Sequence, residues 1–341
     1  MKQGLMVVST PPIINIGDYI QALAAKQYFN KIDCYIERER LSVYNGDPVK
    51  MIMNGWYMVE PQYWPPSNKI KPLFISFHIN SLAKERMLKD DSIKYLKQHE
   101  PIGCRDIETM NILKEKGVNS YFSGCLTLTL NNTYKSNKRG NKIYFVDPAI
   151  NIARNDKLSI LKGLIYLIFH FFTIRKLMKK FKYYKKRSGM WLVAAAFYKT
   201  YSKTFTDDFL FNAEYIDHES PEIGQQYKTN EEKFKRAEEL IKMYSEAACV
   251  VTSRIHCALP CLSLETPVIY IKRGEQSQTS ACRLNGLSDL FNVMVQNKNE
   301  LVPYFDKKGK INISNFPKNK DSYKKLQKDL RETSQSFVSE D

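Results

Sequence analysis

The sequence predicts an α/β protein built from two Rossmann-like lobes. Short apolar runs such as residues 248–251 (ACVV) and 267–271 (PVIYI) have the length and the β-branched content of strands buried on both faces. Longer segments with helical periodicity separate such runs, which is the order expected of a parallel sheet covered by helices. With 341 residues, 43% of them hydrophobic, the chain is long enough for two such units, each with its own core.

The first lobe is expected over residues 1–135. Lys116 and Gly117 end an apolar-periodic segment, where a cation and a residue that tolerates a left-handed conformation stop a helix. Residues 131–141 (NNTYKSNKRGN) are poor in apolar side chains, so we place the boundary between the lobes there. The elements predicted before it are strands at 5–8, 34–36, 49–53, 74–78, 101–106 and 120–126 and helices at 19–29 and 107–116.

The second lobe is expected over residues 141–316 and contains a long excursion at 155–203, which we interpret as a helical insertion. Residues 317–341 form a polar, partly helical tail that could cross back to the first lobe. Outside the insertion the predicted elements are strands at 142–146, 248–251 and 268–271 and helices at 230–246 and from 253 onward.

The charge of the chain favours anionic partners. Its net charge of +16 and pI near 9.3 suit nucleic acid, anionic lipid and phosphorylated metabolites alike. The seven cysteines form no CxxC pair and lie mostly in apolar stretches, which fits a reducing cytoplasm. The first residues have too short an apolar core for a signal peptide, so the cytoplasm is the expected location.

Polar side chains gather where the predicted strands end, which is where ligands bind in open parallel sheets. Ser253, Arg254 and His256 follow the strand at 248–251 and begin a helix, whose free N–H groups favour an anion. Arg binds carboxylate or phosphate through a fork of hydrogen bonds, and His exchanges protons near neutral pH, so the set suits a small, doubly anionic substrate. The other candidates, at strand ends or at the first helix start, are Asn15, Gly17, Asp18, Asn54, His78, Arg105, Ser123 and Gly124.

Structural roles remain open for three of these residues. Arg254 can be a solvated surface charge, His256 a hydrogen-bonded residue at a helix start, and Asp18 the N-cap of the first helix. The usual signals of dinucleotide, phosphate-loop and metalloprotease sites are absent from the sequence, and no paired-Asp metal cluster stands out.

Five segments carry a resemblance to a known family. They are NIGDYIQALAAKQYF at 15–29, NGW at 54–56, FISFH at 74–78, GCRDIETMNILKEKG at 103–117 and VVTSRIHCALPCLSLETPVIYI at 250–271. In this order and spacing the chain resembles the polysaccharide pyruvyl transferase family over residues 5–286, apart from the excursion at 155–203. The resemblance implies a fold similar to that of the GT-B glycosyltransferases. It also implies transfer of the pyruvyl group of phosphoenolpyruvate onto a sugar as a cyclic ketal.

The resemblance also suggests roles for the candidate residues. Phosphoenolpyruvate carries a carboxylate and a phosphate, so Arg105 from the first lobe and Arg254 from the second are the candidate clamps. His256 is the candidate proton donor, and Asp18 the candidate acceptor of a proton from the sugar. The second lobe would bind the donor and the first the acceptor. Neither a metal nor a cofactor is expected, because fixed arginines neutralise the anions.

The implied setting is the synthesis of a bacterial surface or capsular polysaccharide. The alternative is a GT-B-like glycosyltransferase that uses a nucleotide sugar, because its second lobe would also bind phosphate at a helix start. Nucleic acid is not expected as a partner, since the basic residues concentrate beside an apolar run instead of alternating with exposed aromatic residues.

The excursion also suggests a partner. Residues 158–174 (LSILKGLIYLIFHFFTI) are apolar, and residues 175–187 (RKLMKKFKYYKKR) are mostly basic. The apolar run is shorter than the ~20 residues of a bilayer span, so we expect it to dock on the cytoplasmic face of a membrane, where the acceptor sugar is lipid-linked. The alternative is a core helix beside a solvated basic helix.

Overall fold

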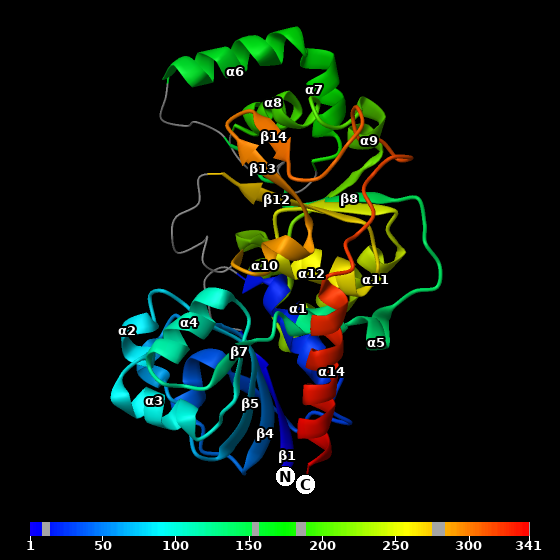
Figure 1. Cartoon of the computed structure of the whole chain (residues 1–341). Coiled ribbons are helices and arrows are strands. Elements are labelled where there is room, and N and C mark those ends of the chain that lie inside the picture. Colours follow the sequence, from blue (N-terminus) through cyan, green and yellow to red (C-terminus); the bar gives the residue numbers. More distant parts are fainter. Residues whose placement is uncertain (9–13, 152–156, 182–188, 275–283, 341) are drawn as a thin grey trace.

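The chain folds into two lobes, each built around a six-stranded sheet (Figure 1). The coordinates are a computed structural model, which describes residues 1–8, 14–151, 157–181, 189–274 and 284–340. All strand pairs in the two sheets are parallel except the last pair of the second sheet. The predicted α/β class and the Rossmann-like two-lobe arrangement are therefore confirmed.

The first sheet has the strand order β3-β1-β4-β5-β6-β7. Successive side chains of its strands face opposite layers, as Met51 and Ile52 of β4 do in two different apolar clusters. Its strands are β1 (Lys2–Val7), β3 (Cys34–Glu37), β4 (Val49–Tyr57), β5 (Ile70–Ile79), β6 (Ile102–Cys104) and β7 (Ser120–Phe122). Its helices are α1 (Ile16–Lys26), η1 (Arg38–Val43), η2 (Pro61–Tyr63), α2 (Lys84–Met87), α3 (Asp90–Lys97), α4 (Ile107–Glu115), η3 (Leu126–Thr129) and α5 (Asn131–Tyr134).

The second sheet has the strand order β14-β13-β12-β11-β8-β9, with β14 antiparallel. Val250 of β11 faces the cluster of α11 and α12, while Val251 faces the cluster of α7, α8 and α9. Its strands are β8 (Ile143–Val146), β9 (Glu214–Ile216), β11 (Cys249–Thr252), β12 (Val268–Arg273), β13 (Asn292–Asn297) and β14 (Glu300–Pro303). Its helices are α6 (Lys157–Phe169), α7 (Phe171–Met178), α8 (Met190–Tyr201), α9 (Asp207–Asn212), α10 (Pro221–Gln226), α11 (Asn230–Glu246), α12 (Ile255–Ser263) and η6 (Ser288–Leu290).

Three features join the lobes. One apolar cluster continues from α1 and β1 of the first lobe to α11, α12 and β11 of the second. A two-stranded antiparallel ribbon pairs β2 (Ile14–Asn15) with β10 (Glu219–Ser220). The C-terminal helix α14 (Tyr323–Ser339) crosses from the second lobe and runs along the first (Figure 1), where Gln327 Nε2 donates to the Leu128 carbonyl at 2.6 Å. The tail thus crosses back to the first lobe.

A bulge interrupts the pairing of β4 with β5 near their carboxyl ends, between Met53 and Gly55. Gly55 has φ +137°, and Ser76, on the facing strand, has φ +56°, a left-handed conformation that is rare for a residue other than Gly. Bulges redirect the side chains around them. This one contains Asn54, and Ser76 on the facing strand lies two residues before His78.

The strands and helices with long apolar patterns were found where the sequence places them. The helix predicted at 230–246 is α11, residue for residue, and it begins with a capping box formed by Thr229 and Glu232. The strands that the sequence did not reveal are β2, β9, β10, β13 and β14. Within the predicted insertion, the described residues form α6, α7 and α8.

No helix in the described part of the chain is long and apolar enough to cross a bilayer.

Candidate functional site

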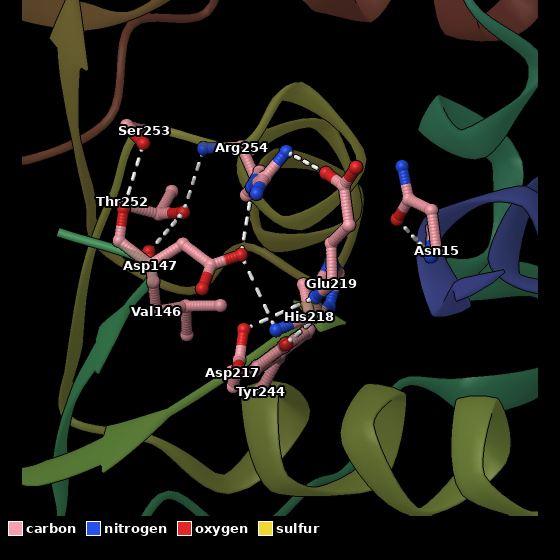
Figure 2. A network of polar contacts seen from close by, with 11 residues as sticks. Asn15, Val146, Asp147, Asp217, His218, Glu219, Tyr244, Thr252, Ser253 and Arg254 are labelled. Carbon is pink, nitrogen blue, oxygen red and sulfur yellow. Dashed lines mark hydrogen bonds and ion pairs between the residues drawn. The ribbon is translucent and has the colours of Figure 1, made fainter. Parts of the chain in front are cut away.

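The centre of the candidate site is Arg254, which follows β11 and occupies the N-cap position of α12 without a capping hydrogen bond from its side chain. Its Nε donates to Asp147 Oδ2 at 2.7 Å, and its Nη1 pairs with Glu219 (Figure 2). Asp147 follows β8, and Glu219 comes shortly after β9. The carboxyl ends of three adjacent parallel strands therefore deliver one guanidinium and two carboxylates to the same point, which is where ligands bind in such sheets.

Two hydroxyl groups fix the loops that carry this ion-pair cluster. Thr252 Oγ1 donates to the Val146 carbonyl and accepts from the Arg254 N–H, both at 2.9 Å. Ser253 Oγ donates to the Asp147 carbonyl at 2.7 Å. The loops after β8 and β11 are thus tied together at their first residues, so Ser253 positions the backbone around Arg254.

Arg254 is one third exposed, with 33% of its side chain accessible. Burial would by itself lower the pKa of Arg254, but Asp147 and Glu219 outweigh it and raise the pKa above its ordinary value. The guanidinium is therefore charged at every pH of interest and faces two carboxylates. An incoming anion therefore competes with these two carboxylates for the guanidinium, which favours anions that offer several oxygens.

A buried histidine that sequence reasoning missed lies beside the cluster. The backbone N–H of His218 donates to Asp147 Oδ2 at 3.2 Å, and its ring Nε2 is 2.8 Å from the hydroxyl of Tyr244 (Figure 2). The His218 ring is fully buried, and this burial lowers its pKa to about 4. His218 is therefore neutral near pH 7, and its Nδ1 has no hydrogen-bond partner among the described residues.

The first lobe reaches the same place through the start of α1. Asn15 caps α1, because its Oδ1 accepts from the Gly17 N–H at 2.9 Å, so the alternative in which Asp18 is the N-cap is wrong. The Ile16 N–H donates to the His218 carbonyl at 3.0 Å. Asp18 lies in the first turn of α1, where Gln21 donates to its carboxylate at 3.0 Å.

Gly17 and His256 bring the two helix starts together. A Cβ built on Gly17 would lie 3.1 Å from the Cβ of His256 and 3.3 Å from its Nδ1, closer than most side chains allow. Gly is needed here because it lets α1 and α12 approach so closely. His256 lies in the first turn of α12 and is 6% exposed.

A second polar cluster is buried within the first lobe, at the carboxyl ends of β5 and β6. His78 Nδ1 lies 2.5 Å from Asp106 Oδ2, and the Asp106 side chain also caps α4 by accepting from the Thr109 N–H at 2.9 Å. Burial would by itself raise the pKa of Asp106, but His78, Arg105 and the cap hydrogen bond outweigh it and lower the pKa. Arg105 is only 1% exposed.

The remaining candidates hold the first lobe together. Ser123 Oγ donates to the Cys104 carbonyl at 3.1 Å and accepts from the Ser76 N–H at 3.0 Å, which connects the ends of β5 and β6. Gly124 has φ +71°, and a side chain there would approach Leu326 of α14. Asn54 is buried and donates to the Gln21 carbonyl of α1 at 2.9 Å.

The candidates thus fall into two groups. Asn15, Gly17, Ser253, Arg254 and His256 meet where the lobes join, with Asp18 on the adjoining turn of α1. The second group belongs to the first lobe and contains Asn54, His78, Arg105, Ser123 and Gly124. The residues that sequence reasoning missed are Asp106, Asp147, His218, Glu219 and Tyr244; of these, only Asp106 and Asp147 had a signal, because each ends a predicted strand.

The burial of His218 predicts a pH dependence of stability. Its folded-state pKa of about 4 lies below the ordinary value of 6.5, so the unfolded chain binds more protons between these pH values. The contribution of the neutral ring is fully present above pH 6.5 and is lost as the pH falls toward 4. Between pH 6.5 and 4 the free energy of unfolding should fall by roughly 3 kcal/mol at most through this group. Urea denaturation at a series of pH values measures the fall.

The variant His218→Gln isolates the contribution of His218 to the pH dependence of stability, because it removes the titrating group and keeps a side chain that can bond to Tyr244. Its stability should fall less steeply between pH 6.5 and 4 than that of the wild type. A half-buried histidine of the first lobe provides the matched control: partial burial lowers the pKa of His99 as well, so His99→Gln should flatten the slope, but less than His218→Gln does. Equal slopes for wild type and His218→Gln would contradict the prediction.

No curated protein matches the chain. Among solved structures, the chain is similar to a "functional uncharacterized protein" from Klebsiella pneumoniae, with 14% identity and a TM-score of 0.42, over 87% of this chain and 93% of the other. The family model described as "Polysaccharide pyruvyl transferase" matches residues 15–275, from the cap of α1 to just beyond the end of β12. That match covers more than half of the sequence and includes both the Asn15 to Asp18 segment and Arg254 with His256. The chain therefore belongs to the polysaccharide pyruvyl transferase family.

Proposed function

We propose that this protein transfers the pyruvyl group of phosphoenolpyruvate onto a sugar as a cyclic ketal. The observation that carries the proposal is Arg254, a partly exposed guanidinium at the junction of the lobes, within the part of the chain that matches the family. The donor has a carboxylate and a phosphate, and either group offers the oxygens needed to replace Asp147 or Glu219 on Arg254. No metal or other cofactor is part of this proposal.

The reaction requires one proton donor and one proton acceptor. The methylene carbon of the donor gains a proton, a sugar hydroxyl then bonds to the neighbouring carbon, and its proton leaves. The bond from that carbon to the phosphate oxygen breaks, a second hydroxyl bonds in its place, and the departing inorganic phosphate takes up the proton that this hydroxyl loses. We assign the donation to His256, next to Arg254 at the start of α12, and the acceptance to Asp18 on α1.

Arg105 is the second proposed clamp, but it requires a movement of the protein. Its side chain is 1% exposed beside Asp106, so a ligand can contact the guanidinium only after neighbouring groups move. In the structure described here, the charge of Arg105 helps to keep the carboxylate of Asp106 ionised next to His78. We therefore expect Arg105 to act only in a more open arrangement of the first lobe.

The finer assignments belong to the same proposal. The two sheets would act as the lobes of a GT-B-like fold, with the donor on the second lobe and the acceptor on the first, and residues 155–203 would be an insertion into the second. The acceptor would be a lipid-linked sugar intermediate of a bacterial surface or capsular polysaccharide, used at the inner face of the cytoplasmic membrane.

The alternative is a glycosyltransferase that uses a nucleotide sugar, because the diphosphate of that donor would also suit Arg254 at the start of α12. Incubation with phosphoenolpyruvate, or with sugar nucleotides, each in the presence of acceptor sugars, separates the two. Release of inorganic phosphate and a ketal product detected by mass spectrometry are expected. Nucleotide release without phosphate release from phosphoenolpyruvate would favour the alternative.

The variant Arg254→Lys tests the anion site without leaving Asp147 and Glu219 unpaired. Lys keeps the charge but loses the forked geometry, so phosphoenolpyruvate should bind at least about tenfold more weakly while the melting temperature stays near that of the wild type. Titration calorimetry measures the affinity. Arg86→Lys is the matched control, because Arg86 lies on α2 of the first lobe, is 25% exposed and bonds to Asp91 through both of its Nη atoms, and this variant should bind normally. Equal affinities for both variants would remove Arg254 from the donor site.

The variant His256→Gln tests proton donation. It keeps the size of the side chain and some hydrogen bonding, so turnover should fall about a hundredfold while donor affinity changes little. The pH profile should also lose the limb that His256 contributes. His99→Gln serves again as the control, since His99 packs against Tyr95 and belongs to neither group of candidate residues. Near-normal turnover of His256→Gln across the pH range would return His256 to a structural role at the helix start.

A further inference from the structure

An apolar surface is exposed at one end of the second lobe. Of the sixteen large apolar side chains that are exposed in the described chain, seven lie within residues 161–172, and an eighth, Trp191, stacks on Phe171. The other eight lie elsewhere on the surface. Ile168, Phe169 and Phe172 are the most exposed of the seven, at 73%, 81% and 82%. We call this set the apolar ridge; it consists of Leu161, Leu164, Ile165, Ile168, Phe169, Phe171 and Phe172. Clusters of this kind mark interaction sites on soluble proteins.

The ridge is presented by helices that are otherwise anchored. Helix α7 buries Ile174, Leu177 and Met178 in the core of the second lobe. Helix α6 lies across α8 at the end of the second lobe that is distant from the first (Figure 1). Of its described side chains, Tyr166 and Leu167 pack against that core. A helix as apolar as α6 is normally covered on most sides, yet six of its ten residues from 160 to 169 are exposed. The core-helix alternative therefore fits α7 but not α6.

The charge of the chain is concentrated in the same region. Residues 157–206 contain twelve Lys and Arg and no Asp or Glu, so these fifty residues carry +12 of the net +16 and all other residues together carry +4. Among the described ones, Arg175, Lys176, Lys179 and Lys180 are exposed on or just after α7, adjoining the ridge. An apolar ridge beside a dense set of cations matches the boundary of an anionic bilayer, where headgroups meet acyl chains.

A cationic pocket lies beneath α6. Its volume is about 310 Å³, and it is an open pocket lined by Asn151, α6, α8 and the turn between β13 and β14. Lys162, Lys199 and Lys298 line it together with apolar groups such as Leu192, and no acidic residue lines it among the residues that the structure describes. A smaller cavity of about 160 Å³ shares Lys298 and adds Arg273. The three lysines can therefore hold a phosphate at the edge of the ridge.

We propose that the apolar ridge inserts into the headgroup boundary of an anionic membrane and that the pocket beneath α6 receives the phosphate of a lipid headgroup. A second copy of the chain fits the ridge less well. Pairing two ridges would bring together two regions that each carry a charge of +12, and these regions would repel each other. The docking is independent of the proposed transfer reaction, since it is measured as binding and not as turnover.

Co-sedimentation with vesicles tests the ridge. The wild type should pellet at low salt with vesicles that contain phosphatidylglycerol, pellet less at high salt, and stay in solution with pure phosphatidylcholine. The double variant Phe169→Ser with Phe172→Ser should weaken binding at least about tenfold and should fold normally, because both side chains are exposed. Leu82→Ser is the matched control, since Leu82 is 82% exposed on the first lobe, and it should bind like the wild type.

A second set of variants tests the pocket. Replacing Lys162, Lys199 and Lys298 by Gln should weaken vesicle binding on the order of a hundredfold, at about fivefold per lysine. Replacing Lys89, Lys94 and Lys97 on the first lobe removes the same charge from exposed positions and should cost less than about threefold. Inorganic phosphate at millimolar concentration should compete weakly, because it lacks the acyl chains that the ridge contacts.

Each contrary outcome has a clear meaning. The proposal is overturned if the wild type stays in solution with anionic vesicles at low salt, or if the double Phe variant binds like Leu82→Ser. A dimer is the other contrary outcome. The proposal is overturned if the wild type dimerises, the double Phe variant stays monomeric, and neither protein binds vesicles. If both triple lysine variants lose vesicle binding equally, the pocket has no specific role. If inorganic phosphate abolishes vesicle binding, the pocket is a site for a free anion and not for a lipid headgroup.

Discussion

One apolar core shared by both lobes is the constraint on which the site depends. Helices α1, α11 and α12 pack side chains into a cluster that includes strands of both sheets. The close approach of Gly17 to His256 and the hydrogen bond from Ile16 to His218 lie at the edge of that core. A rotation of the lobes about their junction would have to break these contacts, so the polar groups of the two lobes are held in one arrangement by apolar packing.

The electrostatics of the site follow from this packing. Arg254 is matched by two carboxylates, and the neutral ring of His218 lies beside Asp147, so the cluster carries no surplus of positive charge. Its selectivity for an anion would thus depend on how well the anion competes with Asp147 and Glu219 for the guanidinium, more than on long-range attraction by positive charge. The cluster around Asp106 in the first lobe repeats this arrangement with His78 and Arg105, at deeper burial.

The sequence was informative where a structure depends on local chemistry. The helix α11 has a capping box and an amphipathic face, and the strands β11 and β12 are continuous apolar runs, so each could be located from its own residues. The strands β9, β2 and β10 have three, two and two residues and owe their existence to their partners across the sheet or across the lobes. For the same reason Arg254 could be proposed as a binding residue, but its pairing with Asp147 and Glu219 could not, since those partners lie 107 and 35 residues away along the chain.

The path of α14 brings the two ends of the described chain close together. Gln3 of β1 is paired with Lys50 of β4, and the Lys50 ammonium bonds to the carbonyl of Glu340, so the first strand and the end of the last helix lie one strand apart. Both ends lie at the pole opposite α6 (Figure 1). A short peptide could therefore join them into a closed ring, and the ring could be reopened at an exposed loop to give a circular permutant in which neither sheet is cut.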